Sequence, residues 1–235
     1  MSGGNPSGTG GPGGHRQVKV RLKTARQRSA SSQRWLERQL NDPYVSAAKR
    51  EGYRSRAAYK LAELEAKHRF LRPGMRVVDL GAAPGGWAQV AADRVRAVEG
   101  RGQVVAIDIL DMESLPGVEF IHLDFMDPAA PERLRGMLRD GQANVVLSDM
   151  AAQGTGHGRT DHLRIMGLAE AAAEFAIDVL APGGTFVCKV LQGGTERALL
   201  ERLKRAFATV KHVKPPASRA QSAELYLVAA GFRGH

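Results

Sequence analysis

Five charged side chains mark the places where apolar segments of this sequence end. Four short apolar runs lead into Asp79, Asp108, Asp124 and Asp149, and a fifth encloses Lys189. Apolar runs of this length predict buried strands, and ligands of open α/β sheets bind where the parallel strands end. We therefore expect the four acids and the lysine to gather at one edge of a sheet.

Lys189 is the most informative of the five, because a lysine inside an apolar strand is costly to bury unless it is paired or functional. Placed near Asp149, its amine can act as a base or as a fixed positive charge. A purely structural ion pair between these two residues is the alternative.

A glycine-rich turn follows the first of these strands. Residues 77–87 predict a strand, a tight loop and the start of a helix. Gly81 and Gly85 permit backbone angles that a Cβ would forbid, and the helix start offers unpaired N–H groups to a ligand. This layout is typical of a nucleotide pocket, in which we expect Asp79 to brace the loop.

Two of the acids have spacings that suit a nucleotide ligand. Asp108 follows Gly86 by 22 residues, close to the ~20 residues at which an acid binds a ribose hydroxyl in nucleotide-binding folds. Asp124 is placed to accept hydrogen bonds from an adenine amino group, or from backbone amides as a cap of a turn.

The elements that position these residues alternate between strands and helices. Seven strands are expected over residues 76–80, 103–109, 118–123, 143–148, 184–190, 210–214 and 224–229. Helices are expected over 35–40, from an N-cap at Ser55 to about 70, from the glycine loop to about 98, and over 131–139, 163–180 and 195–208. This order predicts a Rossmann-like α/β fold with helices on both faces of a mostly parallel sheet. Because the last two strands follow each other directly, we expect the last strand to be antiparallel.

The charge of the chain is concentrated at its N-terminal end. Residues 1–60 hold 13 Lys and Arg against 3 Asp and Glu, whereas the remaining residues hold 21 of each. We expect residues 1–34 to be a disordered tail, glycine-rich and then basic, followed by a single domain over 35–235. Within it, 35–74 would form a helical extension and 75–232 the sheet core. A basic arm on a neutral domain favours a polyanionic partner, with a solubilising tail as the alternative.

Composition also excludes several classes of protein. We find no signal peptide and no apolar run long enough to span a membrane. The single cysteine, Cys188, excludes an intrachain disulfide and a cysteine-based metal site. We expect a cytoplasmic protein without a metal, and a monomer, because no further apolar surface segment stands out.

Five segments together resemble one enzyme family. They are Ser55–Lys60, Asp79–Trp87, Ser148–Ala151, Val187–Val190 and Ser218–Glu224. In this order they are similar to the FtsJ/RrmJ family of S-adenosylmethionine-dependent ribose 2′-O-methyltransferases, and most of all to its bacterial members that act on a uridine of 23S ribosomal RNA.

The resemblance implies site residues as well as an activity. It places the catalytic set on Lys60, Asp149, Lys189 and Glu224. It places contacts with S-adenosylmethionine on Gly81, Gly85, Trp87, Asp108, Asp124 and Asp149. It also implies ribosomal RNA or the large ribosomal subunit as the partner. From their charge, we expect the N-terminal arm, which lies outside the resemblance, and Lys49, Arg50, Arg54 and Arg56 to contact its phosphates. Lys60 and Glu224 rest on the resemblance alone.

Three other functions stay open at this point. A related enzyme could methylate transfer RNA or another RNA with the same site. An NAD-dependent oxidoreductase would use the same loop and Asp108, although the acids and the lysine have no evident role in hydride transfer. A third possibility is an RNA-binding protein without catalytic activity.

We predict that deleting residues 1–30 leaves the fold intact and weakens RNA binding. If the arm neutralises phosphates, the dependence of the RNA dissociation constant on salt concentration should become shallower. Thermal unfolding and RNA binding at several salt concentrations test this prediction. An unchanged salt dependence would contradict a phosphate-binding arm.

Overall fold

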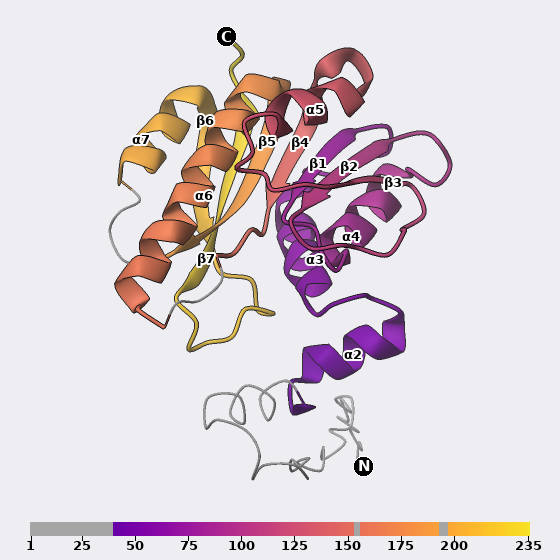
Figure 1. The fold of residues 1–235 in the computed structure, drawn as a ribbon, viewed down its shortest axis with the longest axis vertical. Coiled ribbons are helices and arrows are strands. Elements are labelled where there is room, and N and C mark those ends of the chain that lie inside the picture. The colour runs from indigo at the N-terminus through magenta and orange to yellow at the C-terminus, as the bar shows by residue number, and fades with distance from the viewer. Residues whose placement is uncertain (1–39, 153–155, 193–196) are drawn as a thin grey trace, which may run out of the picture. The chain divides into compact units, whose positions relative to one another are not determined.

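The computed structural model describes residues 40–152, 156–192 and 197–235. Residues 47–235 form one compact unit, built around a seven-stranded sheet in the order β3-β2-β1-β4-β5-β7-β6 (Figure 1). Its strands are β1 (Arg76–Leu80), β2 (Gln103–Asp108), β3 (Val118–His122), β4 (Ala143–Ser148), β5 (Leu180–Leu191), β6 (Phe207–Val213) and β7 (Glu224–Phe232).

The direction of the strands confirms the predicted fold class. The five strands from β3 to β5 are parallel, and β7 lies antiparallel between β5 and β6. In the register of β5 and β7, Lys189 is opposite Tyr226 and Leu191 is opposite Glu224. The last strand therefore brings two polar side chains to the carboxyl end of β5.

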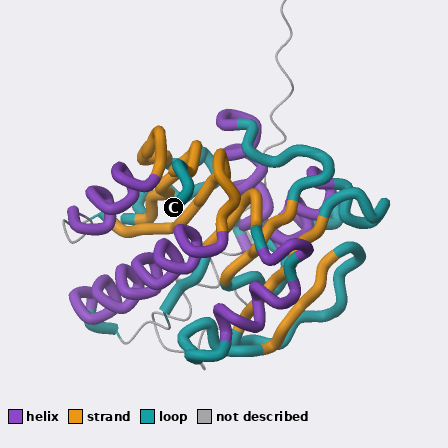
Figure 2. Tube along the Cα trace, turned by 90° about the horizontal axis from the view of Figure 1, so that it is seen from above, coloured by secondary structure: helices purple, strands orange, loops and turns teal. Residues whose placement is uncertain are grey.

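Helices cover both sides of this sheet (Figure 2). The helices of the described residues are α2 (Pro43–Glu51), α3 (Ala57–His68), α4 (Gly86–Val95), α5 (Ala130–Met137), α6 (Gly158–Val179) and α7 (Arg197–Ala206), with a short 3₁₀ turn at Arg139–Gly141. Those packed on the sheet are α3 to α7. None of the described helices is both long and apolar enough to cross a membrane.

Two buried clusters separate the faces of the sheet. Val77 and Val104 pack with residues of α3 and α4, whereas Val78 and Val105 pack with residues of α5, α6 and α7. This alternation follows from the strand period of two. Lys189, two residues after Val187 of the first cluster, therefore faces the layer of α3 and α4.

Two local predictions near the N-terminal end were wrong. No helix was predicted between residue 40 and Ser55, yet α2 begins at Pro43, where a proline suits the first turn of a helix. Ser55 was expected to cap α3, but the residue at the cap is Arg56, without a side-chain hydrogen bond. The Ser55 hydroxyl instead lies against Gly86 of α4, because a Cβ added there would lie 2.3 Å from it.

Other differences are at the ends of elements. The predicted helix over 35–40 lies, apart from Leu40, outside the described residues. α4 ends at Val95 rather than near 98, because Arg96 adopts a left-handed backbone with φ of 59°. β5 begins earlier than predicted, since Leu180 already pairs with Ala143 before a register shift in β4.

The junction of α4 and β2 depends on a glycine. A Cβ added at Gly102 would lie 2.4 Å from the carbonyl oxygen of Val95, which is too close for the backbone to accept without moving. We predict that Gly102→Ala lowers the free energy of unfolding by about 1–3 kcal/mol, measured by chemical denaturation.

The matched control is Gly136→Ala in α5, where an added Cβ meets nothing within 4 Å. Stability should be unchanged there, or raised by up to about 1 kcal/mol because alanine favours the helix. Equal losses at both positions would contradict the steric explanation.

Candidate active site

The glycine loop (residues 81–85) joins β1 to α4 and has the backbone that its glycines were expected to permit. Gly81 and Gly85 have φ angles of 79° and 109°, both in the region that favours glycine. A Cβ at Gly81 would lie 2.7 Å from the side chain of Met150. The absence of a side chain thus lets the loop after β1 approach the loop after β4.

Asp108 holds this loop in place from the end of β2. Its carboxylate accepts a hydrogen bond of 2.8 Å from the Ala83 N–H, and another of 2.8 Å from the Leu110 N–H. The bracing that we expected from Asp79 therefore comes from Asp108. Each carboxylate oxygen can still accept a further hydrogen bond, since it has two lone pairs.

Asp124 is exposed and stabilises the turn after β3, where it accepts a 2.9 Å hydrogen bond from the Met126 N–H. The ends of β2 and β3 lie side by side, because the Leu123 N–H donates to the Asp108 carbonyl at 3.0 Å. Large apolar side chains near both acids are exposed to solvent, namely Ile109 (60%), Leu110 (59%) and Met126 (55%). Apolar surface beside convergent polar groups is typical of a site for an organic ligand.

Asp79 is fully buried, and neither carboxylate oxygen reaches a hydrogen-bond partner of ordinary geometry among the described residues. Burial, and to a smaller extent the charges of Asp149 and Asp108, raise the pKa of Asp79 to about 8; the Ala88 N–H opposes this rise only in part. The group is therefore mostly protonated at neutral pH.

Lys189 and Asp149 form a buried ion pair at the ends of β5 and β4. The Lys189 Nζ donates to the Asp149 carbonyl at 2.6 Å and lies 3.2 Å from its Oδ1. The lysine is 7% exposed. The Asp149 backbone is itself fixed, because its N–H donates to the Leu80 carbonyl at 3.2 Å. The amine is thus held at the same sheet edge as the glycine loop.

Tyr226 of β7 contacts the same carboxylate, a role that we did not foresee. Its hydroxyl donates to Asp149 Oδ1 at 2.9 Å. Burial and the neighbouring charges of Asp149 and Glu224 raise the pKa of Tyr226 well above its usual range, so the hydroxyl keeps its proton. The register between β5 and β7 brings the Tyr226 hydroxyl to Asp149, and this register could not be predicted from the sequence.

A second buried ion pair lies on the other side of Tyr226. The Lys60 Nζ of α3 is 2.9 and 3.0 Å from the two carboxylate oxygens of Glu224. It also lies 5.7 Å from the centroid of the Tyr226 ring. Taken as a lysine on a helix, Lys60 would pass for a surface residue, yet it is 8% exposed.

The predicted site residues thus fall into two groups. Lys60, Asp149, Lys189 and Glu224 are joined through Tyr226, and Gly81, Gly85, Asp108 and Asp124 lie on the adjoining loops. The indole of Trp87 is turned into the core, where its N–H donates to the Ala57 carbonyl at 2.9 Å. Trp87 is 2% exposed, so its indole is a core side chain at the start of α4.

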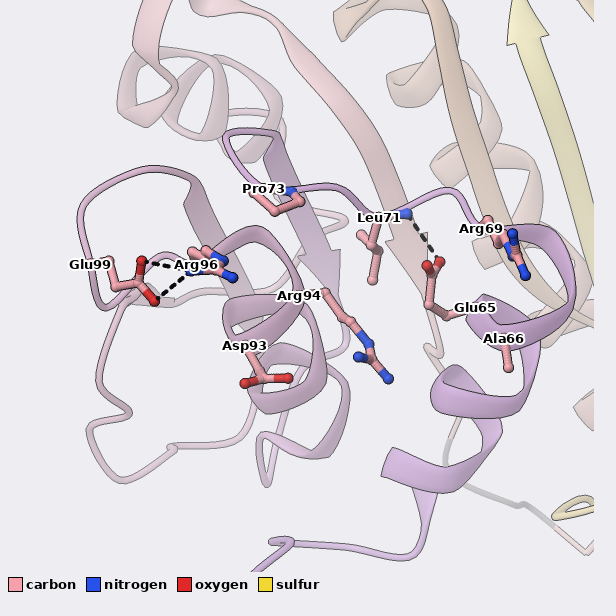
Figure 3. Close-up of a pocket in the computed structure, with 9 residues that line it drawn as sticks. All are labelled: Glu65, Ala66, Arg69, Leu71, Pro73, Asp93, Arg94, Arg96 and Glu99. Carbon is pink, nitrogen blue, oxygen red and sulfur yellow. Dashed lines mark hydrogen bonds and ion pairs between the residues drawn. The ribbon is translucent and has the colours of Figure 1, made fainter.

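A separate pocket of about 660 Å³ lies near the C-terminal ends of α3 and α4 (Figure 3). It is lined by Glu65, Ala66, Arg69, Leu71, Pro73, Asp93, Arg94, Arg96 and Glu99. No predicted site residue is among them, and the glycine loop lies at the opposite end of α4. Three arginines and three acids balance its charge.

Comparison with known proteins agrees with this geometry. The FtsJ-like methyltransferase family matches residues 53–232. This chain belongs to that family.

Its relatives include proteins named ribosomal RNA large subunit methyltransferase E. The one from Azorhizobium caulinodans is 64% identical over 93% of this chain and 91% of its own length. The one from Parvibaculum lavamentivorans is 62% identical over 98% and 93%. A crystal structure of a putative ribosomal RNA methyltransferase from Plasmodium falciparum is 32% identical, with a TM-score of 0.69 over 78% of this chain and all of that one.

Metal ligands do not gather in the parts of the chain that the structure describes: no three His, Cys, Asp or Glu side chains there are arranged to hold an ion. The site is instead made of acids, lysines and a tyrosine.

The buried carboxyl of Asp79 predicts a pH-dependent stability. Its pKa in the folded chain, about 8, lies above the ordinary 3.8, so between these values the folded chain holds a proton that the unfolded chain has released. The free energy of unfolding should therefore fall as pH rises through this window, by at most about 1.4 kcal/mol per pH unit.

Asp79→Asn removes this contribution, so its stability relative to the wild type should increase from about pH 4 to about pH 8 and then level off. Denaturant unfolding across this range measures the difference. Asp93→Asn is the control for the loss of a carboxylate as such, because Asp93 is an exposed acid of α4. A flat profile for Asp79→Asn would refute the assignment.

Proposed function

We propose that this chain transfers a methyl group from S-adenosylmethionine to the ribose 2′-hydroxyl of a uridine in 23S ribosomal RNA. The observation that carries the proposal is the buried pairing of Lys189 with Asp149 and of Lys60 with Glu224, joined through Tyr226. Membership of a methyltransferase family supports the reaction, and the names of the relatives support the substrate.

The residues around the glycine loop fit the methyl donor. Asp108 and Asp124 would accept hydrogen bonds from its ribose and its adenine amino group, and the exposed Ile109 and Met126 would contact the apolar faces of the base. The negative charge of the Asp149 carboxylate, next to the glycine loop, would favour binding of the positively charged sulfonium group. When bound, S-adenosylmethionine supplies a methyl group that its sulfonium sulfur has already activated.

Lys189 would act on the attacking hydroxyl. A ribose hydroxyl is a weak acid that must lose its proton around the time it attacks the methyl group. Oriented by the carbonyl and carboxylate of Asp149, Lys189 would take this proton in its neutral amine form, or, as an ammonium, stabilise the negative charge that develops on the oxygen. Because Lys189 is 7% exposed, water screens little of the attraction between its positive charge and that oxygen.

Lys60 would supply a second positive charge, for the same oxygen or for a neighbouring phosphate. Glu224 holds its ammonium group through both carboxylate oxygens, so the direction of the amine is set before the RNA binds. Most of the rate should come from aligning hydroxyl, methyl and sulfur in these fixed surroundings.

The contacts with RNA differ from our expectation in one respect. Arg54 and Arg56 were assigned to phosphates, but each donates hydrogen bonds to backbone carbonyls of this chain. Lys49 and Arg50 at the end of α2 remain exposed, and with the N-terminal arm they are the proposed phosphate contacts. Transfer RNA or another RNA is the alternative substrate.

Lys189→Ala tests the proposed function. At saturating S-adenosylmethionine we expect methyl transfer to fall by about 100-fold or more, while the dissociation constant of the donor changes little. The measurements are donor binding by calorimetry and a map of 2′-O-methylation across ribosomal RNA, with large ribosomal subunits as the substrate.

Lys204→Ala is the matched control, because Lys204 is an exposed lysine on α7 and its loss should leave methyl transfer unchanged. Near-normal turnover by Lys189→Ala, or a loss explained by donor binding alone, would refute the assigned role. If large subunits stay unmethylated while transfer RNA, assayed in parallel, is methylated, the proposed substrate is refuted.

A further inference from the structure

The side chain of Arg54 crosses from the α2–α3 linker (residues 52–56) to the loops that follow β1 and β2. Its Nη1 donates to the Glu113 carbonyl at 2.6 Å and to the Pro84 carbonyl at 3.4 Å, and its Nη2 donates to the Ser114 carbonyl at 2.6 Å. One guanidinium group therefore connects the glycine loop with the β2–β3 loop (residues 109–117).

The linker that carries Arg54 is itself tied to α4. The Arg54 N–H donates to the side-chain oxygen of Gln89 at 3.1 Å, and the Gln89 amide donates to the Gly52 carbonyl at 2.8 Å. These two hydrogen bonds fix the base of the arginine on the first turn of α4. The guanidinium is thus anchored to the helix that begins at the glycine loop.

Packing at Gly85 shows how closely Arg54 covers the loop. A Cβ added at Gly85 would lie 3.0 Å from Arg54 Cδ and 3.1 Å from Met112 Sδ. The stem of the arginine and the methionine therefore lie directly over the glycine, one from the linker and the other from the β2–β3 loop.

The two loops that Arg54 connects are also the two that Asp108 braces from the sheet, through the N–H groups of Ala83 and Leu110. Asp108 acts at the strand end, and Arg54 acts at the outer side of the same loops. The planar guanidinium directs N–H groups from two separate nitrogens at carbonyls of the two loops, a fixed geometry that the single ammonium nitrogen of a lysine does not reproduce.

We propose that Arg54 is a positioning residue for the methyl donor, which holds the glycine loop and the β2–β3 loop together around the donor site. The assignment rests on the proposed function, because it takes these loops to bind S-adenosylmethionine. This role differs from the phosphate contact that we expected from the sequence. The guanidinium N–H groups of Arg54 bind three carbonyls of the chain itself, so they hold the two loops and do not bind RNA.

Arg54→Lys and Arg54→Ala test this role, with Arg56→Ala as the matched control. Arg56 lies in the same linker and also donates to a backbone carbonyl, that of Ala217 at 2.5 Å, but this carbonyl belongs to the β6–β7 connection. We expect both Arg54 variants to bind S-adenosylmethionine about tenfold more weakly, the loss of a charge-assisted hydrogen bond or more. Their kcat at saturating donor should stay close to that of the wild type, and Arg56→Ala should bind the donor normally.

Hydrogen exchange gives a second measurement that a general loss of stability would not mimic. Amides of residues 110–115 should exchange faster in Arg54→Lys, whereas amides of β4 should not. If Arg54→Ala fails to fold, Arg54→Lys keeps the test decisive, because it retains the charge and most of the stem.

The outcomes separate the two proposals. The assignment would be overturned if both Arg54 variants bound the donor normally but bound RNA more weakly, with a dissociation constant that depends less on salt concentration. Arg54 would then be a residue that binds RNA phosphates. A wild-type chain that binds no S-adenosylmethionine would overturn the proposed function and the assignment with it.

Discussion

Burial of the Lys189 ammonium group is the constraint on which the rest of the site depends. Asp149 binds the ammonium group through both its carbonyl and its carboxylate. Removing one partner of such a buried ion pair lowers the free energy of unfolding by about 3–5 kcal/mol. The same carboxylate accepts the Tyr226 hydroxyl, and the Tyr226 ring lies close to the Lys60 amine. Asp149 therefore holds Lys189 directly and also holds Tyr226, whose ring lies beside the Lys60 amine that Glu224 binds.

The antiparallel strand β7 makes this arrangement possible. It lies between β5 and β6, with Tyr226 opposite Lys189 and Glu224 opposite Leu191. Since alternate residues of a strand share a face, Glu224 and Tyr226 both face the layer of α3 that carries Lys60. A further parallel strand would need a crossover helix, whereas β7 follows β6 directly and brings its first residues to the carboxyl end of β5.

The strands and the acids at their ends were predictable because they depend on short stretches of sequence. β1 and β4 match at both ends, since each is a short segment built around two adjacent valines, Val77–Val78 in β1 and Val145–Val146 in β4. Contacts between elements were not predictable. Whether Asp79 or Asp108 braces the glycine loop depends on where the Ala83 N–H points, and the position of Ser55 depends on the space that Gly86 leaves in α4. Tyr226 was missed for the same reason, because its contact is set by the register between strands.

Of the features read from the sequence, charge was the poorest guide to contacts. A count of arginines does not say which groups their N–H groups bind. Arg54 and Arg56 belong to the basic N-terminal quarter of the chain, yet both donate to carbonyls of the domain itself. Lys49 and Arg50, a few residues earlier, are exposed. The α2–α3 linker thus follows the residues proposed for RNA and carries the residue that holds the donor loops. Because Gln89 binds this linker to α4, and Arg54 binds the glycine loop and the β2–β3 loop, the linker, the first turn of α4 and the glycine loop form one hydrogen-bonded unit.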